Sequence, residues 1–526
     1  ESESTDGFNL NLCIASEPQS IDPALNTAMD GSVMCHHMFE GLVKWADDGE
    51  GNAVTVPGQA ESWDKETNDD GTVTYTVHLR DGIKWSDGQA VTAGDFEYSW
   101  KRLANPETAA DYNYMLDGVV NANEIIAGEK DPDELAAKAL DDKTFEVTLV
   151  SDLSYFEELC AFPAMMPVRE DMIEKAGDQW TFDTSTYISN GAYKLKEWTH
   201  NSQIVVEKNE NYYDVENLGP ETITFKLMDD QNAMLSGFNS GELDFIEDVP
   251  QAEIANLIAS GDMKIVDYIG TYYVCFQTQK APFDDPRVRK AFSLAIDRTY
   301  IVNQVTQSGQ VEAGGFVPSG VYDADGADGD DFRTVGGDYY KPTDADYEAN
   351  CDEARQLLAD AGYPNGEGFP VVEYLYNTSD AHKAVAEALQ FMWEEELGVK
   401  VTLNNQEWAA FLQTRKDGDY SIARNGWIAD YNDPISFLDM WMTGGGNNDA
   451  QYANDDYDAL IKQAKTTTDN AERMDLLHQA EDKLIGEDNV LAPLYFYTQK
   501  YMLADGIEGM YYCPLGYFFF GYTHQA

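Results

Sequence analysis

The sequence predicts an α/β protein with several domains, and three observations lead to that prediction. The chain has 526 residues, which at about 150 residues per domain corresponds to about three or four domains, or to fewer large ones. Apolar residues make up 43% and aromatic residues 12%, so the chain can bury a substantial core. Between residues 350 and 430 the patterns follow the order β-α-β-α-β, which indicates parallel strands joined by right-handed crossovers.

This alternating segment is predicted element by element. Helices are expected at 351–361, 380–397 and 408–416, and strands at 371–376, 399–403 and 420–423. Gly362, Gly398 and Gly418 follow the three helices and can end them. The helix at 380–397 is amphipathic, with its inward face formed by Val385, Leu389, Met392 and Trp393. Ligands of such sheets lie beyond the carboxyl ends of the strands, so we predict a binding site at 424–434, after the last strand.

Two other segments have clear patterns. Residues 72–80 alternate apolar and polar side chains between two turns, which predicts a half-buried strand. Thr92 can cap a helix that runs through Leu103 and ends before Pro106. Residues 319–349 are rich in Gly and Asp and are expected to form a long surface excursion.

The charge balance excludes two classes of partner. Lys and Arg total 34 and Asp and Glu total 95, so the formal net charge is 34 − 95 = −61. Nucleic acids and anionic lipid surfaces are polyanions, and they would repel such a chain.

Neither a membrane-spanning segment nor an export signal is evident in the sequence. No stretch approaches the roughly 18 consecutive apolar residues of a spanning helix, and no basic, apolar signal segment opens the chain. The polar leader at residues 1–7 is compatible with a protein trimmed after a signal or a lipid anchor, and equally with a cytosolic protein.

The cysteines are scattered and include no Cys-x-x-Cys pair, which argues against a zinc site or a thioredoxin-type motif. We expect most of them to be buried free thiols, with one disulfide left open. They are Cys13, Cys35, Cys160, Cys275, Cys351 and Cys513.

Catalytic and metal-binding motifs are absent from the sequence. It has no Gly-x-Ser-x-Gly, Walker, Gly-x-Gly-x-x-Gly or His-Glu-x-x-His motif, so we expect neither an enzyme nor a cofactor. The acidic run 323–328 lacks calcium-loop spacing and is expected to be a solvated loop, and 66–71 is better explained as a hairpin turn. Neighbouring His36 and His37 are expected on a helix surface rather than at a metal, because adjacent helical residues diverge by about 100°.

Many segments, in order along the chain, resemble one family. They are EPQSIDP at 17–23, FEGL at 39–42, LRDGIKWSDG at 79–88, VTAGDF at 91–96, SNGAY at 189–193, APFDDPRVR at 281–289, YNTSD at 376–380, NQEW at 405–408 and GWIADYNDP at 426–434. The chain thus resembles the oligopeptide-binding proteins of ABC peptide importers. The last three segments point to the peptide-binding branch.

The resemblance implies a fold and a division into domains. The fold would be the two-lobed, type II periplasmic-binding-protein α/β fold with an additional inserted domain. Lobe I would comprise 1–44, 169–269 and 490–526, the inserted domain 45–168, and lobe II 270–489, which would carry much of the ligand site.

It also implies residues that contact a peptide. Asp430 matches the acid that pairs with the α-amino group, and such a charge-assisted bond contributes about 1.5–3 kcal/mol. Trp408 and Trp427 match tryptophans that line roomy, hydrated side-chain pockets. Gly426, Trp427 and Ile428 would pair through their backbone with the peptide main chain, as an added strand. Tyr112 matches a cleft tyrosine, with Tyr114 as the alternative.

The peptide carboxylate needs a cation, and Arg424, Arg415 and His382 match family positions that serve it at different peptide lengths. The chain departs from the family at three points. A lysine of some relatives has no equivalent near 303–306, an acid of relatives corresponds to Cys275, and a disulfide of some relatives would fall at Gly270 and Ile428. Peptide length and side-chain preference therefore stay open.

The function implied is capture of short peptides outside the cytoplasm and delivery to an ABC permease. The resemblance further implies a monomer that is periplasmic or a cell-surface lipoprotein with an N-terminal anchor. The alternatives are a receptor of the same fold for nickel, haem or an oligosaccharide, a peptidase or glycosidase, and a sensory or adhesive surface protein.

Overall fold

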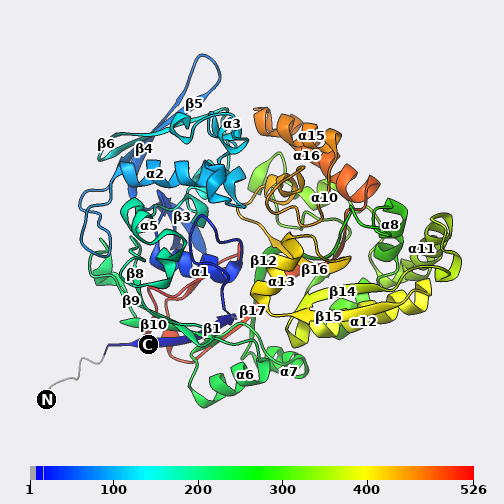
Figure 1. The fold of residues 1–526 in the computed structure, drawn as a ribbon. Coiled ribbons are helices and arrows are strands. Elements are labelled where there is room, and N and C mark those ends of the chain that lie inside the picture. The colour runs from blue at the N-terminus through cyan, green and yellow to red at the C-terminus, as the bar shows by residue number, and fades with distance from the viewer. Residues whose placement is uncertain (1–6, 16) are drawn as a thin grey trace. The chain divides into compact units, whose positions relative to one another are not determined.

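The computed structural model describes residues 7–15 and 17–526, so most of the polar leader predicted at 1–7 lies outside the described residues. The chain divides into two compact units, each made of segments far apart in sequence. Unit 1 contains residues up to Met228, Ala233–Glu247 and Met502–Ala526, and unit 2 contains Asp229–Asn232 and Asp248–Tyr501. Figure 1 shows the elements of both units.

The main sheet of unit 1 has the strand order β11-β1-β10-β9-β8. Its strands are β1 (Asn9–Ala15), β8 (Tyr193–Thr199), β9 (Gln203–Lys208), β10 (Thr222–Leu227) and β11 (Phe245–Ile246). The first strand of the chain lies between β10 and β11 and runs parallel to both. The last strand of the main fold, β17 (Leu491–Leu503), reaches this sheet through Met502 and Leu503, which pair with β11.

A second sheet of unit 1 is antiparallel, with the order β4-β5-β7-β6. Its strands are β4 (Ala60–Thr67), β5 (Val73–Leu79), β6 (Ala137–Asp141) and β7 (Thr144–Leu149). The alternating burial of β5 confirms the strand predicted at 72–80. Helix α2 (Ala93–Ala104) packs on this sheet, with Trp100 edge-on to Phe145 at 5.2 Å, and a capping box at Thr92 confirms its predicted start.

The rest of unit 1 consists of short elements and its helices. They are α1 (Met29–Met38), β2 (Val43–Asp47), β3 (Ala53–Pro57), α3 (Ala122–Ile126), α4 (Phe156–Leu159), α5 (Glu170–Ala176), β18 (Ile507–Glu508), β19 (Tyr511–Cys513), β20 (Tyr517–Phe519) and β21 (His524–Gln525). Helix α6 (Gln231–Ser240) begins at the border of the units. The prediction that His36 and His37 lie on a helix surface is wrong for His37, which is buried beside Phe520. His36 is partly buried, with its ring against Tyr517 and Phe519.

Unit 2 is built on a mixed sheet of order β15-β14-β16-β12-β17, with β13 paired to β17. Its strands, besides β17, are β12 (Lys264–Phe276), β13 (Val311–Glu312), β14 (Val372–Asn377), β15 (Val401–Gln406) and β16 (Ile422–Ile428). Strands β15, β14 and β16 are parallel, which confirms the predicted β-α-β-α-β segment. The crossover helices α12 (Asp380–Leu397) and α13 (Trp408–Lys416) have the predicted bounds, and the predicted inward face of α12 is buried.

The end of this segment differs from its prediction. Strand β16 continues to Ile428, so residues 424–428 lie within the strand instead of following it. The Arg-Asn-Gly sequence is typical of a turn, but pairing with β12 from Phe276 to Gly270 holds these residues extended.

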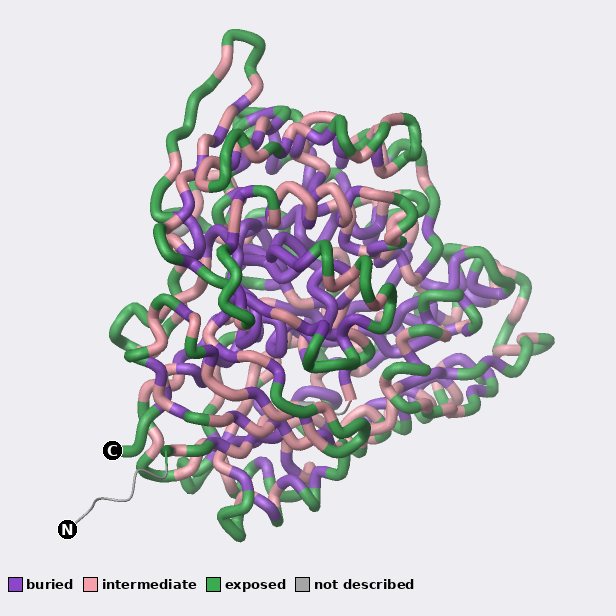
Figure 2. Tube along the Cα trace, turned by 60° about the vertical axis from the view of Figure 1, so that its left-hand side comes forward, coloured by how far each residue is buried: buried purple, intermediate pink, exposed green. Residues whose placement is uncertain are grey.

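Besides α12 and α13, unit 2 contains further helices. They are α7 (Ile254–Ser260), α8 (Pro286–Leu294), α9 (Arg298–Tyr300), α10 (Phe332–Gly336), α11 (Tyr347–Asp360), α14 (Ile435–Leu438), α15 (Asp455–Thr466) and α16 (Asn470–Glu481). Phe292 of α8 and Trp393 of α12 meet at 5.2 Å in the core. Figure 2 shows the buried stretches inside and the exposed ones at the surface loops.

The segment 319–349 is less exposed than predicted. Val321 and Phe332 are fully buried, and Phe332 stacks on His478 with ring centroids 3.8 Å apart. Asp323 is buried and pairs with His478 at 2.7 Å, so its assignment to a solvated loop is wrong. The interaction with the His478 imidazole offsets part of the free-energy cost of burying this acid.

Two further predictions can be compared with the structure. All six cysteines are buried free thiols, which confirms that expectation. Within residues 7–15 and 17–526, no helix combines the length and the apolar character needed to cross a membrane.

Candidate functional site

The predicted ligand residues divide between the two units. Tyr112 belongs to unit 1, and the others belong to unit 2. Those of unit 2 are His382, Trp408, Arg415, Arg424, Gly426, Trp427, Ile428 and Asp430. Five of them lie on β16 or directly after it, so this strand positions most of the candidate site.

Strand β16 has one paired edge and one partly open edge. β12 pairs with β16 along its whole length, whereas β14 pairs only with Ile422 and Ala423. Past Ala423, no described strand covers the second edge. In an antiparallel pair alternate residues turn their N–H and C=O groups outward, and since Ala429 N–H bonds to Ile269 on β12, Gly426 and Ile428 are the outward residues. Gly426 N–H donates to the side chain of Asn425 at 2.8 Å.

Asp430 lies in the loop between β16 and α14. It is only 7% exposed, its N–H donates to Ser436 Oγ at 2.8 Å, and Ser436 Oγ is 3.5 Å from its carboxylate. The Trp427 indole N–H donates to the Ser436 carbonyl at 2.7 Å. One serine thus orients both the candidate amine acceptor and the candidate pocket tryptophan.

The same loop is held from two further sides. Arg473 of α16 binds the buried Asp433 carboxylate through both terminal nitrogens, at 2.6 and 2.8 Å. Asn432 donates to the Gly320 carbonyl at 3.1 Å and accepts from Tyr322 N–H at 3.0 Å. The 319–349 segment therefore helps to fix the loop that carries Asp430.

Arg424 is a buried cation without a carboxylate partner in the described chain. Its guanidinium lies over the ring of Tyr272 at 5.0 Å and donates to Tyr497 Oη at 3.2 Å. Its Nε has no hydrogen-bond partner among the described residues. Phenol rings stabilise a cation only partly, so the positive charge of Arg424 is available to an anion.

The other two candidate cations differ from Arg424. Arg415 Nε is 2.7 Å from Asp449 Oδ2, so its charge is already balanced. His382 Nδ1 is 3.2 Å from Tyr272 Oη. Burial, together with the nearby charges of Arg424 and Lys500, lowers the pKa of His382 well below 6.5, so this imidazole is neutral at pH 7.

The remaining aromatic candidates lie on different elements. Trp408 begins α13, is half-buried, and stacks on Phe411 with centroids 6.0 Å apart. In unit 1, Tyr112 is buried against Phe162 at 4.9 Å and Tyr114 at 5.7 Å.

The positions where the chain departs from the resembled family are also visible. Gly270 and Ile428 are directly opposed partners of β12 and β16, at the place where some relatives would have a disulfide. Cys275 is buried with Sγ 3.2 Å from Tyr420 Oη, and burial raises its pKa to about 12, so it carries no charge there.

Sequence reasoning missed several residues that shape this site. Tyr272 and Tyr497 enclose Arg424, and Asp433 and Arg473 fix the Asp430 loop. The alternation of Tyr495 and Tyr497 along β17 was an available signal, because residues two apart share a face of a strand. No local signal joins Asp433 to Arg473, which is 40 residues away.

The geometry describes a binding site. In the described part of the chain, no group of three or more His, Cys, Asp or Glu side chains is placed to hold a metal ion. A buried cation, a buried acid and an open strand edge on one α/β unit define the class: a protein that binds an extended, polar solute.

Comparisons with known proteins specify that class. Residues 54–449 match the family described as bacterial extracellular solute-binding proteins, family 5. The periplasmic oligopeptide-binding protein OppA of Salmonella typhimurium is 38% identical over 499 residues, covering 94% of this chain and 88% of that protein. The oligopeptide-binding protein OppA of Bacillus subtilis is 35% identical over 507 residues, covering 95% and 90%.

A solved structure agrees with these sequence matches. The crystal structure of Haemophilus influenzae OppA in complex with RPPGFSPFR has a TM-score of 0.90 and 31% identity, covering 99% of this chain and 100% of that one. The fold is thus the type II periplasmic-binding-protein fold predicted above. The chain belongs to the bacterial extracellular solute-binding proteins of family 5.

Proposed function

We propose that this protein binds peptides outside the cytoplasm and delivers them to the permease of an ABC importer. The observation that carries the proposal is the combination, on one strand and its following loop, of an open main-chain edge, the buried Asp430 and the unbalanced Arg424. It is further supported by relatives named as oligopeptide-binding proteins. The protein itself would carry out no chemical step.

Main-chain pairing would supply affinity that does not depend on peptide sequence. Gly426 and Ile428 turn polar backbone groups away from β12, and the described strands leave this edge open, although the Gly426 N–H already donates to the Asn425 side chain. An extended peptide satisfies such groups as an added strand, and its side chains then point alternately to either side. Trp408 and Trp427 would contact some of those side chains.

The peptide termini would be recognised by opposite charges. Asp430 would accept hydrogen bonds from the α-ammonium group, and its orientation by Ser436 keeps that acceptor preorganised. Arg424 would receive the α-carboxylate of peptides long enough to reach it, since its charge lacks a carboxylate partner in the described chain. Arg415 and His382 would contribute less, because one is paired with Asp449 and the other is neutral.

Three parts of the assignment extend further than the site. We propose that lobe I, the inserted domain and lobe II follow the bounds predicted from the sequence. We also propose that the protein is a monomer held at the membrane by an N-terminal lipid anchor. Tyr112 is proposed as the contribution of the inserted domain to ligand binding.

Native mass spectrometry of the purified protein tests the proposed function. Co-purified masses of short peptides are expected, and denaturing the protein should release them. Calorimetry with one released peptide should then show binding that weakens about tenfold or more in Asp430→Asn, since a charge-assisted bond contributes about 1.5–3 kcal/mol.

The matched control is Asp419→Asn, which removes an acid that is 77% exposed on the same unit. It should leave peptide affinity unchanged. N-acetylation of the peptide should weaken binding to the unaltered protein and have no further effect in Asp430→Asn. Equal affinity of the unaltered protein and Asp430→Asn would remove the amine-anchor assignment, and co-purification of haem, nickel or a sugar in place of peptides would favour the alternative receptor.

A further inference from the structure

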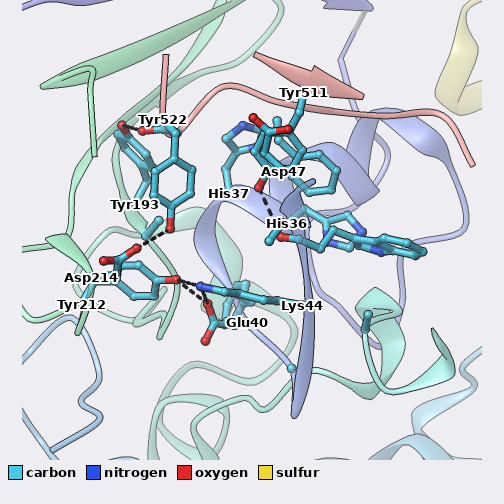
Figure 3. A pocket seen from close by; sticks show the side chains of 18 of the residues that line it. His36, His37, Glu40, Lys44, Asp47, Tyr193, Tyr212, Asp214, Tyr511 and Tyr522 are labelled. Carbon is cyan, nitrogen blue, oxygen red and sulfur yellow. Dashed lines mark hydrogen bonds and ion pairs between the residues drawn. The ribbon is translucent and has the colours of Figure 1, made fainter. Parts of the chain in front are cut away.

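Networks of hydrogen-bonded side chains occur in both units, and they differ in what they bond to. In unit 1, side chains around a cavity of about 480 Å³ satisfy one another: Lys44 Nζ donates to Tyr212 Oη at 3.0 Å and lies 3.5 Å from Glu40 (Figure 3). Groups paired in this way need no ligand. In unit 2, by contrast, a network of side chains ends on the backbone of β16, the strand with the partly open edge.

The network of unit 2 consists of Arg415, Asp449 and Asn425, which we call the edge cluster. Arg415 comes from the last turn of α13, Asn425 from β16, and Asp449 from the connection between β16 and α15. One carboxylate oxygen, Asp449 Oδ2, is 2.7 Å from Arg415 Nε and accepts from Asn425 Nδ2 at 3.1 Å. Arg415 and Asn425 are 9% and 2% exposed, so this oxygen holds two buried side chains in place.

The edge cluster bonds to two successive polar groups of the open edge. Alternate residues of β16 turn outward, so Arg424 is an outward residue like Gly426. Arg415 Nη1 donates to the Arg424 carbonyl at 3.3 Å, and the Gly426 N–H donates to Asn425 Oδ1 at 2.8 Å. One residue of a parallel strand would bond to the same carbonyl and N–H. The edge cluster therefore continues the ladder of hydrogen bonds where β14, which pairs only with Ile422 and Ala423, ends its pairing.

The Asn425 amide has a single satisfied orientation. Its oxygen faces the Gly426 N–H and its NH₂ group faces the Asp449 carboxylate, so a flipped amide would set oxygen against oxygen and N–H against N–H. A ligand that displaced Asn425 would leave this buried oxygen without a partner. Such a loss costs more than one new neutral hydrogen bond returns. Asn425 therefore keeps the Gly426 N–H when a ligand binds.

We propose that Asn425 is a specificity-determining residue, and that the edge cluster ends the paired segment of a bound peptide at the Gly426 carbonyl. This inference rests on the proposed function. Asp430 follows β16, so a peptide whose amine lies there runs from Ile428 toward Arg424. Its main chain bonds to Ile428 and to the Gly426 carbonyl, and leaves the strand at that point. The number of peptide residues that β16 pairs is thus set by three side chains of the protein.

The free protein tests the capping by Asn425 without any peptide. Hydrogen exchange of the Gly426 amide, followed by NMR with isotope-labelled glycine, should be slow in the unaltered protein and faster in Asn425→Ala. The matched control is Asn404→Ala, which removes an amide of β15 that bonds to the Glu373 side chain. It should leave the exchange of Gly426 unchanged.

Complexes with tetra-alanine test the limit on pairing. In a crystal structure of the unaltered protein with this peptide, the Gly426 N–H should still donate to Asn425. In Asn425→Ala a peptide carbonyl should lie at hydrogen-bond distance, about 2.7–3.2 Å, from the Gly426 nitrogen. Calorimetry should show tetra-alanine binding about fivefold more tightly to Asn425→Ala, the usual effect of one added neutral hydrogen bond, and equally to Asn404→Ala and the unaltered protein.

The outcomes separate this inference from the function on which it rests. A peptide carbonyl on the Gly426 N–H of the unaltered protein would overturn the limit on pairing, and that structure needs no variant. Unchanged tetra-alanine affinity in Asn425→Ala would overturn it as well. Unchanged exchange of Gly426 in Asn425→Ala would overturn the capping alone, with peptide binding unaffected. Absence of peptide binding in every form of the protein would overturn the proposed function and the limit on pairing together.

Discussion

Arg473 on α16 donates two hydrogen bonds, of 2.6 and 2.8 Å, to the carboxylate of Asp433, and both side chains are buried. Asp433 lies three residues after Asp430, in the same loop. The ion pair therefore ties the loop of the candidate amine acceptor to a helix of the core. Together with Ser436 and Asn432, it holds the loop that carries Asp430 in place.

Arg473→Met should lower both stability and peptide affinity. Removing one partner leaves the Asp433 charge buried and unpaired, and such losses are about 3–5 kcal/mol. Chemical denaturation would measure the free energy of unfolding, and calorimetry the affinity. The double variant Arg473→Met, Asp433→Leu should recover much of the stability, because no buried charge remains, but little of the affinity. A double variant as unstable as the single one would contradict the assignment of the loss to an unpaired charge.

Arg424→Met should remove the preference for a free peptide carboxylate. The unaltered protein is expected to bind a peptide acid at least about tenfold more tightly than its C-terminal amide, since a charge-assisted hydrogen bond contributes about 1.5–3 kcal/mol. In the variant the acid and the amide should bind alike. Arg415→Met is the control, since Asp449 already balances that arginine, and it should keep the preference. If the preference for the peptide acid were lost in Arg415→Met and kept in Arg424→Met, Arg415 would be the residue that binds the carboxylate, and Arg424 would not.

Acid should destabilise the protein through its buried histidines. Burial lowers the pKa of His36 to about 3 and of His37 to about 4, from 6.5. Below pH 6.5 these histidines are therefore protonated in the unfolded chain but stay neutral in the folded one. The free energy of unfolding then falls as the pH falls, by up to roughly 1.4 kcal/mol per pH unit for each group. Denaturation curves between pH 7 and pH 5 should show a shallower fall in His36→Phe than in the unaltered protein. Identical curves for His36→Phe and the unaltered protein would refute the assignment.

The net charge of −61 should speed the capture of cationic peptides. A surface of one sign attracts opposite charge over a Debye length of about 10 Å at 0.1 M salt, so the association rate of a Lys- or Arg-rich peptide should fall as salt is added. Stopped-flow fluorescence would measure these rates, with an uncharged peptide of equal length as the control. Rates that do not respond to salt for either peptide would leave solubility as the function of the acidic surface.

Local pattern was sufficient wherever an element is decided by its own residues. The helices at 380–397 and 408–416 have strong periodicity and clear ends, and both were predicted with the bounds that the structure has. Strand β5 and the helix start at Thr92 were predicted equally well from the sequence. The peptide-site residues came from motif resemblance, because an isolated acid such as Asp430 has no distinguishing local pattern among the 95 acids of the chain.

Local pattern failed where distant segments decide. Residues 424–428 look like a turn but form a strand, because β12 pairs with them. His36 and His37 look like a helix surface, but aromatic residues almost 500 positions later pack against both and bury His37. Asp323 belongs to an acidic run that looks solvated, but it is buried and pairs with His478.

By itself, the sequence determined the α/β class, the main elements of unit 2 and, through its motifs, the family of the protein, because periodicity and motifs are properties of neighbouring residues. Only the tertiary structure decided which charges are balanced: Arg415 by Asp449, Asp433 by Arg473, and Arg424 by no carboxylate of the described chain. It also decided that Arg415 and Asn425 bond to two backbone groups at the open edge of β16. Burial and pairing depend on contacts between segments far apart in the chain, and those contacts exist only after folding.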